Sequence, residues 1–230
     1  MSNFKSLYLI LLCFLLVTGC ATSRGVLDIP EVSSATPLQG TALKIVSVTD
    51  QRGFQIKPRQ ADIPSLKGGE INDSKITSRA IARKRNAYGK ALGDILLPEG
   101  KTVMGLVESR LSKGFNDNGY RVLSVGDDGY ELATPVTVDI EKFWGWFSPG
   151  FWSLGINFQT LIVVTAPLGG FEDGVEMGSK VQERFQVASG KNWLTVIQMS
   201  LNQLNRDIQS RVSVSKRSVT KKPSKSGLES

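Results

Sequence analysis

The sequence predicts an α+β fold: a mostly antiparallel sheet of about four to five strands with two amphipathic helices packed on one face. Two observations predict it. Segments between residues 42 and 188 alternate apolar and polar side chains, as strands do. Two other segments, 101–115 and 192–212, repeat apolar side chains every three or four residues, as helices do. Each helix then has one apolar stripe to bury, and the sheet offers a face to bury it on.

The N-terminal segment 1–19 reads as a secretory signal peptide. A positive start that includes Lys5 precedes an apolar run of 11 residues, Leu7 to Val17. This run is too short for a transmembrane helix, which needs about 20 apolar residues. The sequence therefore predicts a segment that is removed from the mature protein.

The residues Val17, Thr18, Gly19 and Cys20 resemble the lipobox of bacterial lipoproteins. In that motif the cysteine thiol receives a diacylglyceryl group before cleavage, so Cys20 is the predicted lipidation site, carrying palmitate or similar acyl chains. Two or three acyl chains bind a membrane far more firmly than one, because each buried methylene adds about 0.8 kcal/mol. Ala21 follows the cysteine, where lipoproteins retained in the inner membrane typically carry Asp. The predicted location is the periplasmic face of the outer membrane.

Composition narrows the possible functions. The chain has 230 residues and a formal net charge of +7, which fits one domain with tails. The two cysteines are Cys13, inside the predicted signal peptide, and Cys20, so no disulfide is expected. The absence of histidine removes the usual general base and the usual metal ligand. We therefore expect no enzyme activity, no catalytic residue, no metal and no cofactor, and the compartment argues against nucleic acid.

Residues 20–41 are rich in Ser, Thr, Pro and Gly and are predicted to form a flexible tether after the lipidated cysteine. Residues 42–212 form the predicted single domain, which begins with a buried strand at 42–49. Asp50 and Arg52 follow that strand two residues apart, so their side chains share a face, and a local ion pair or turn hydrogen bond is expected.

A long basic loop is predicted at 53–100, where periodicity is absent and prolines recur. Between residues 75 and 90 this segment carries only basic charges, among them Arg79, Arg83, Lys84 and Arg85. Two interpretations remain open. These side chains are either simply solvated, or they contact an anionic partner such as lipid head groups or an acidic protein surface.

The remaining elements follow in order. A helix at 101–115 ends before Gly119, and strands are predicted at 120–125, 135–143, 154–165 and 179–188. The second helix covers 192–212, with its apolar stripe beginning at Trp193. Residues 213–230 are polar and basic and are predicted to be a disordered tail.

Six aromatic residues fall between 143 and 152, where a hairpin tip is predicted. Tips usually face solvent and are polar, so this concentration needs a reason. Either the rings fold back over the core, or they form an exposed platform for a protein partner or the membrane surface. The candidate residues for such binding are Trp144, Trp146, Phe147, Phe151 and Trp152.

Several local motifs, taken in this order, resemble the YajG family of bacterial lipoproteins. They are the lipobox, the strand that ends in Asp50-Gln51-Arg52, the helix that closes on Gly119-Tyr120-Arg121-Val122, the strands 136–141 and 157–166, and the terminal helix with Asn202 and Leu204. The resemblance implies the fold and the location, and it supplies no catalytic residue. By element order alone, the chain is also similar to auxiliary lipoproteins of lipid-transport ABC systems.

The predicted function is that of a non-enzymatic, lipid-anchored periplasmic domain of the outer membrane that binds an envelope partner. The alternative is a lipid- or apolar-ligand-binding auxiliary lipoprotein of an envelope transport system. In that alternative the same aromatic residues would line a cavity between the sheet and the helices.

Overall fold

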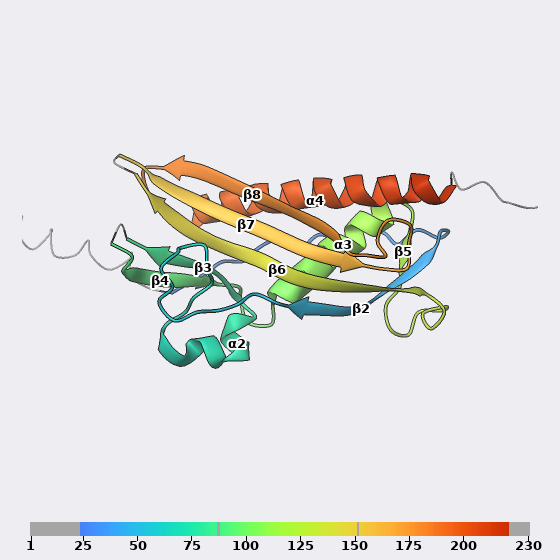
Figure 1. Ribbon diagram of the computed structural model, residues 1–230, viewed down its shortest axis with the longest axis horizontal. Coiled ribbons are helices and arrows are strands. Elements are labelled where there is room, and N and C mark those ends of the chain that lie inside the picture. Colours follow the sequence, from blue (N-terminus) through green and yellow to red (C-terminus); the bar gives the residue numbers. More distant parts are fainter. Residues whose placement is uncertain (1–23, 87, 151, 221–230) are drawn as a thin grey trace, which may run out of the picture.

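The computed structural model describes residues 24–86, 88–150 and 152–220. Its centre is an antiparallel meander of three long strands, β6 (Thr134–Pro149), β7 (Leu154–Thr165) and β8 (Val175–Phe185) (Figure 1). Cys20, Phe151 and residues 221–230 lie outside the described residues. The predicted lipidation site and one predicted aromatic site residue are therefore not placed.

The second edge of β6 is shared by two strands that both run parallel to it. β2 (Ala42–Asp50) pairs with the first half of β6, and β3 (Ala80–Arg85) pairs with it further along, at Gly145 and Trp146. β3 also pairs antiparallel with β4 (Ala91–Leu96). Two short strands complete the sheet: β1 (Gly25–Val26) lies parallel to β4, and β5 (Arg121–Val122) lies parallel to β2.

The predicted fold class is wrong. The strands form one eight-stranded mixed sheet, and four of the seven strand pairings among the described residues are parallel. The prediction missed β1, β3 and β4 because these strands are short, and their residues lacked the alternation that marks a strand exposed on one face. The prediction also assumed antiparallel pairing throughout, because it extended the pattern of the meander to the other strands. Local periodicity does not show which strands pair or in which direction.

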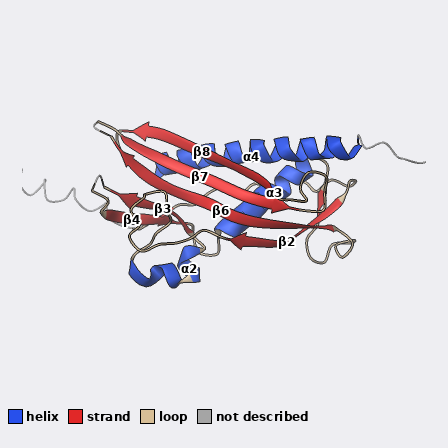
Figure 2. Ribbon diagram, viewed as in Figure 1, coloured by secondary structure: helices blue, strands red, loops and turns tan. Residues whose placement is uncertain are grey.

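Three α-helices accompany this sheet in the described part of the chain, α2 (Ser74–Thr77), α3 (Val103–Asp117) and α4 (Gly190–Thr220) (Figure 2). The long α4 contacts β7 and β8, whereas α3 contacts α4, β2 and β5. Thr102 caps α3, because its hydroxyl accepts a hydrogen bond from the backbone N–H of Gly105 at 3.1 Å. None of the described helices is long and apolar enough to cross a bilayer.

The main core joins the two long helices to the sheet. Buried side chains of α3, such as Leu111 and Phe115, and of α4, such as Trp193 and Leu204, belong to one cluster with Phe143 of β6. Phe143 and Phe158 meet edge to face with their ring centroids 5.1 Å apart. Apolar packing thus holds the described residues 24–220 together, and none of these residues is a cysteine.

A second, smaller cluster packs around Trp144, the next residue along β6. Successive side chains of a strand point to opposite faces of the sheet, so this cluster covers the face opposite Phe143. Its other buried members are Leu66, Ala80 and Leu96. The segment 53–100, predicted to be a loop, therefore contains β3, β4, a 3₁₀ helix η1 (Gly68–Asn72) and α2, and it supplies part of this packing.

Arg52 joins β2 to β3 along the edge of β6. Its guanidinium donates to the carbonyls of Ala80 (2.6 Å), Phe143 (3.1 Å) and Thr77 (2.9 Å). It also forms the predicted ion pair with Asp50 at 2.6 Å, which is confirmed. Arg52 thereby supplies hydrogen-bond donors to backbone carbonyls in the gap between the end of β2 and the start of β3 along the edge of β6.

The described part of the predicted tether, from residue 24 onward, is packed against the domain. Ile29 is fully buried in the main core. Lys101 bonds Asp28 at 2.9 Å and Glu31 at 3.2 Å, and Arg110 donates to the carbonyl of Pro30 at 3.2 Å. A polar composition suggested a free coil, but one buried isoleucine and these long-range bonds fix the segment.

The C-terminal helix is longer than predicted. α4 continues to Thr220, so residues 213–220 of the predicted disordered tail are helical. Val212 is fully buried and Ser215 is buried as well, which shows that the packing extends past the predicted end of the helix.

Candidate functional site

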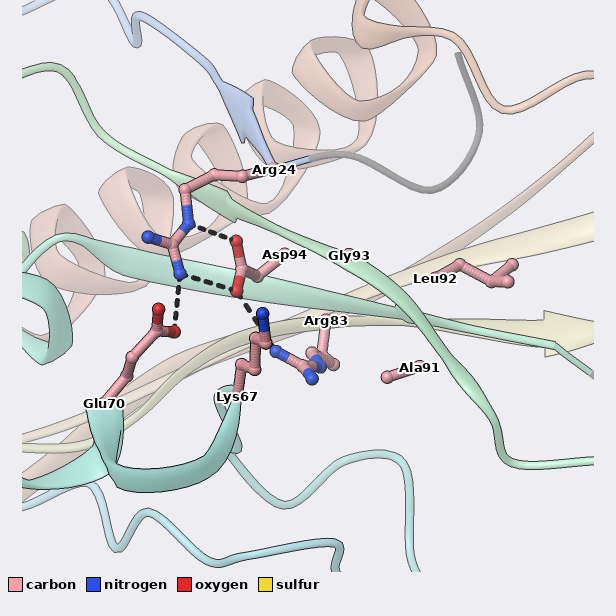
Figure 3. Close-up of a pocket in the computed structure, with 8 residues that line it drawn as sticks. All are labelled: Arg24, Lys67, Glu70, Arg83, Ala91, Leu92, Gly93 and Asp94. Atoms are coloured by element: carbon pink, nitrogen blue, oxygen red, sulfur yellow. Dashed lines mark hydrogen bonds and ion pairs between the residues drawn. The ribbon is translucent and has the colours of Figure 1, made fainter. Parts of the chain in front are cut away.

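A pocket of about 500 Å³ lies where the described chain begins, between β4, η1 and the residue before β1. Figure 3 shows the side chains that line it, and charged groups dominate: Arg24, Lys67, Glu70, Arg83 and Asp94. The remaining lining comes from three successive residues at the start of β4, 91–93. No sequence pattern pointed to this site, because its members come from four segments that are distant in the chain.

The buried carboxylate of Asp94 organises the pocket (Figure 3). Arg24 donates to both oxygens of Asp94, from Nε at 2.7 Å and from Nη2 at 3.0 Å. Nη2 of Arg24 also donates to Glu70 at 2.6 Å, and Nη1 of Arg83 donates to Asp94 at 3.1 Å. The hydrogen bond to Asp94, with the charges of Asp94 and Glu70, raises the pKa of Arg24 above its usual value against the opposing effect of burial.

This network is suited to fixing a chain segment, and it leaves little free chemistry. Both carboxylates are already engaged by Arg24, and the bonds join residue 24 to β4 and η1. A bidentate guanidinium–carboxylate pair defines orientation as well as distance. Arg24 is therefore held in one place relative to the sheet.

The four basic residues predicted to contact an anion lie on or beside β3. Arg83 is buried against Asp94, and Arg79 donates to the carbonyl of Leu97 at 2.9 Å. Arg85 is buried and donates to the carbonyl of Pro58 (2.6 Å) and to Ser65 Oγ (2.7 Å), and burial lowers its pKa. Lys84 is half-buried, and burial lowers its pKa too. The segment is therefore not the loop that was predicted, and these side chains are not simply solvated; contact with an anionic partner stays a prediction.

Most of the aromatic residues predicted at a hairpin tip lie instead within β6. Phe143 and Phe147 are buried in the main core, and Trp144 is buried in the second cluster, with Trp146 packed half-buried against it. The strand continues six residues beyond its predicted end at Phe143, which carries these rings into the sheet. Trp144 and Phe147 are therefore not exposed. Of the two interpretations of this aromatic segment, packing against the core fits these two residues.

Trp152 is the described exception among these aromatic residues, with 85% of its surface exposed. It lies in the turn between β6 and β7. Two other large apolar side chains are exposed in nearby connections: Tyr88 in the turn between β3 and β4 (94%), and Val187 just after β8 (70%). We call these three residues the apolar tips.

Acidic side chains are not grouped as a metal site would require. Among residues 24–86, 88–150 and 152–220, no three Asp, Glu, His or Cys side chains are placed to hold a metal ion.

Comparisons with known proteins identify no family. No family model and no curated protein matches the chain. Solved structures do match, at low similarity. One, described as an uncharacterized protein, has 10% identity and a TM-score of 0.44, covering 83% of this chain and 99% of its own. Another is the Xanthomonas campestris protein XCC0632, of family DUF330, with 11% identity and a TM-score of 0.46, covering 86% and 98%. These likenesses carry no functional argument, and the resemblance to the YajG family stays a prediction.

Proposed function

We propose that this chain is a lipoprotein of the periplasmic face of the outer membrane, anchored by acyl chains on Cys20, whose folded domain binds an envelope partner without catalysing a reaction. The lipobox supports the anchor, and the absence of histidine favours binding over catalysis.

The lipobox is the observation that carries this proposal, and the fixed position of Arg24 limits how far the domain can lie from an acylated Cys20. Arg24 is bonded to Asp94 and Glu70, and it follows Cys20 by four residues. Four residues span at most about 14 Å when fully extended. An acylated Cys20 would therefore hold the domain against the bilayer, without the long flexible spacer that the composition of residues 20–41 had suggested.

The alternative of a cavity that binds an apolar ligand has less support. The rings that would line such a cavity fill the space between sheet and helices themselves: Phe147 and Trp193 lie 5.1 Å apart between centroids, as do Phe143 and Phe158. The pocket of Figure 3 is lined mainly by charged groups, which suits an apolar ligand poorly.

Metabolic labelling with radioactive palmitate tests the anchor. The wild-type chain is expected to incorporate label and to sediment with outer membranes, whereas Cys20→Ser should lose both properties. Cys13→Ser is the matched control, because it removes the other cysteine while leaving the lipobox intact. A Cys20→Ser chain that still sediments with membranes would contradict the proposal.

Crosslinking in intact cells tests the partner. A specific envelope protein should be recovered with the wild-type chain and be lost with Cys20→Ser at equal expression, because the anchor supplies proximity. Recovery of only the most abundant outer-membrane proteins, in unchanged amounts with both chains, would contradict a specific partner.

A further inference from the structure

We infer that the end of the sheet that carries the apolar tips is seated on the phospholipid surface into which the acyl chains of Cys20 insert. This inference rests on the proposed lipid anchor and adds an orientation to it. Four observations carry it: the strand register, the reach of the chain, the exposed side chains and the distribution of charge.

The strand register places the apolar tips at one end of the molecule. β3 and β6 run parallel, with Arg83 opposite Trp146. Tyr88 follows Arg83 by five residues, and Trp152 follows Trp146 by six, so both turns lie beyond the same end of the sheet. β8 also ends there, because its last residue, Phe185, pairs with the first residue of β7. All three connections lie toward the left end of the molecule in Figure 1, with the β3–β4 turn below the other two.

The attachment point lies within reach of that end. Asp94 of β4 pairs with Arg83, so Arg24, bonded to Asp94, sits beside the same level of the sheet. β1 runs parallel to β4 and is entered from the side of Ala91, which adjoins the Tyr88 turn. The chain between Cys20 and Arg24 spans at most about 14 Å. The five residues from Arg83 to Tyr88 cover a similar distance, roughly 15 Å, so Cys20 can lie near the level of the Tyr88 turn.

The exposed aromatic side chains at this end match an interface between water and lipid, whereas the large apolar side chains exposed at the other end, Val125 and Leu132, are aliphatic. Tyr88 and Trp152 are large aromatic residues with 94% and 85% of their surface exposed. Tyrosine and tryptophan favour the head-group region, since the ring is apolar while the O–H or N–H group stays hydrated. Two such residues on neighbouring turns would give the domain two further contacts beside its acyl chains.

The connections at the two ends of the sheet differ in charge. Near the apolar tips, cations outnumber acids: Lys57, Arg59, Lys84, Lys90, Arg184 and Lys191, against Asp62 and Glu183. Lys57 and Arg59 belong to this end because Arg85, the last residue of β3, donates to the carbonyl of Pro58 between them. Lys191 belongs to it because Trp193, two residues later in α4, packs against Phe147 with the two rings tilted.

The connections at the opposite end are acidic. The segments 123–133 and 166–174 contain no Lys or Arg, and their acids are Asp127, Asp128, Glu131, Glu172 and Asp173. An anionic phospholipid surface attracts the basic connections and repels the acidic ones. The last turns of α4, which include Arg211, Lys216 and Arg217, also reach the acidic connections, because Ser215 donates to the carbonyl of Gly169. The orientation therefore rests mainly on the short linkage and the exposed aromatic residues, and the charge of the connections adds to them.

Single-cysteine labelling of the acylated full chain tests this orientation. Cys13 leaves with the signal peptide and Cys20 is acylated, so an introduced cysteine is the one reactive thiol. Tyr88→Cys and Trp152→Cys probe the apolar tips. Leu132→Cys is the matched control, because Leu132 is 94% exposed and lies at the acidic end. Each variant is labelled with the polarity-sensitive dye NBD and reconstituted into vesicles of phosphatidylethanolamine and phosphatidylglycerol.

The labels at 88 and 152 are expected to shift their emission to the blue by about 10 nm or more. Spin-labelled lipid should quench them at least twofold more strongly than the label at 132. Aqueous spectra at 88 and 152 in vesicle-bound, acylated protein would overturn the orientation while leaving the anchor intact. Equal quenching at all three positions would also overturn it. A chain that is not acylated when its mass is measured would instead overturn the proposed anchor.

Discussion

At the scale of the residue, Arg52 shows how one side chain can connect strands that do not pair with each other. It is almost fully buried, and its guanidinium reaches carbonyls from three separate segments as well as both oxygens of Asp50. The ion pair with Asp50 was predictable from their spacing. The carbonyl contacts were not, because Ala80 and Phe143 are 28 and 91 residues away in sequence.

Replacing Arg52 should destabilise the fold strongly. We expect Arg52→Ala to lower the free energy of unfolding by about 3–5 kcal/mol, since buried carbonyls lose their donors and Asp50 loses its partner. Arg52→Lys should recover only part of this, because an ammonium group lacks the planar fork. Urea unfolding of the purified protein in mild detergent measures both. Arg59→Ala, at an exposed position, is the control, expected to stay within about 0.5 kcal/mol of wild type. A loss below about 1 kcal/mol for Arg52→Ala would contradict this role.

A second residue, Gly145, lies where β6 closely approaches Trp193 of α4. A Cβ atom there would lie 2.7 Å from Cζ3 of Trp193 and 2.9 Å from Cδ2 of Phe158. Gly145→Ala should therefore cost about 1–3 kcal/mol of stability through overpacking. Gly53→Ala is the matched control, because no atom lies within 4 Å of its added Cβ. Thermal unfolding of both variants distinguishes them, and equal melting temperatures would show that the packing here is looser than the structure indicates.

At the scale of the element, the sequence was informative where a segment was long and periodic. The strands of the meander and the helices α3 and α4 were all predicted, because each buries one face or stripe and leaves the other wet. The ends were less predictable: β6 and α4 both run several residues further than predicted, and some of the added residues, such as Phe147 and Ser215, are buried.

Three short strands at the sheet margin, β1, β3 and β4, escaped prediction for the opposite reason. β1 has two residues, and a period cannot be recognised in two residues. β3 carries Arg83 and Arg85 in buried positions, which composition alone assigns to a loop. The partner that makes each burial possible, Asp94 for Arg83 and the Pro58 carbonyl for Arg85, is visible only in three dimensions.

The attachment of β1 predicts a local opening. Arg24→Ala removes the bonds to Asp94 and Glu70, so the segment that precedes the domain should detach before the rest unfolds. We expect the amide of Leu27, which donates to Leu96 at 2.9 Å, to exchange hydrogen at least about tenfold faster than in wild type. Arg211→Ala, which removes an exposed pair within α4, is the control. Unchanged exchange at Leu27 would contradict the role of Arg24.

At the scale of the whole molecule, the structure combines a short attachment with an uneven distribution of charge. The network around Asp94 fixes the start of the described chain at the level of Arg83, and the basic end of the sheet extends beyond it. Of the candidate site residues, Trp152 remains a surface residue, whereas Trp144 and Phe147 serve the core. A sequence pattern could mark where aromatic residues concentrate, but it could not divide them between core and surface.

The central claim is that Cys20 becomes an acylated N-terminus, and mass spectrometry of the mature chain isolated from membranes tests it most directly. The account predicts a chain that begins at Cys20 and carries a diacylglyceryl group on its sulfur, with a third acyl chain on its amine. A mature chain that still contains residues before Cys20, or one that begins at Cys20 without any acyl group, would contradict the account.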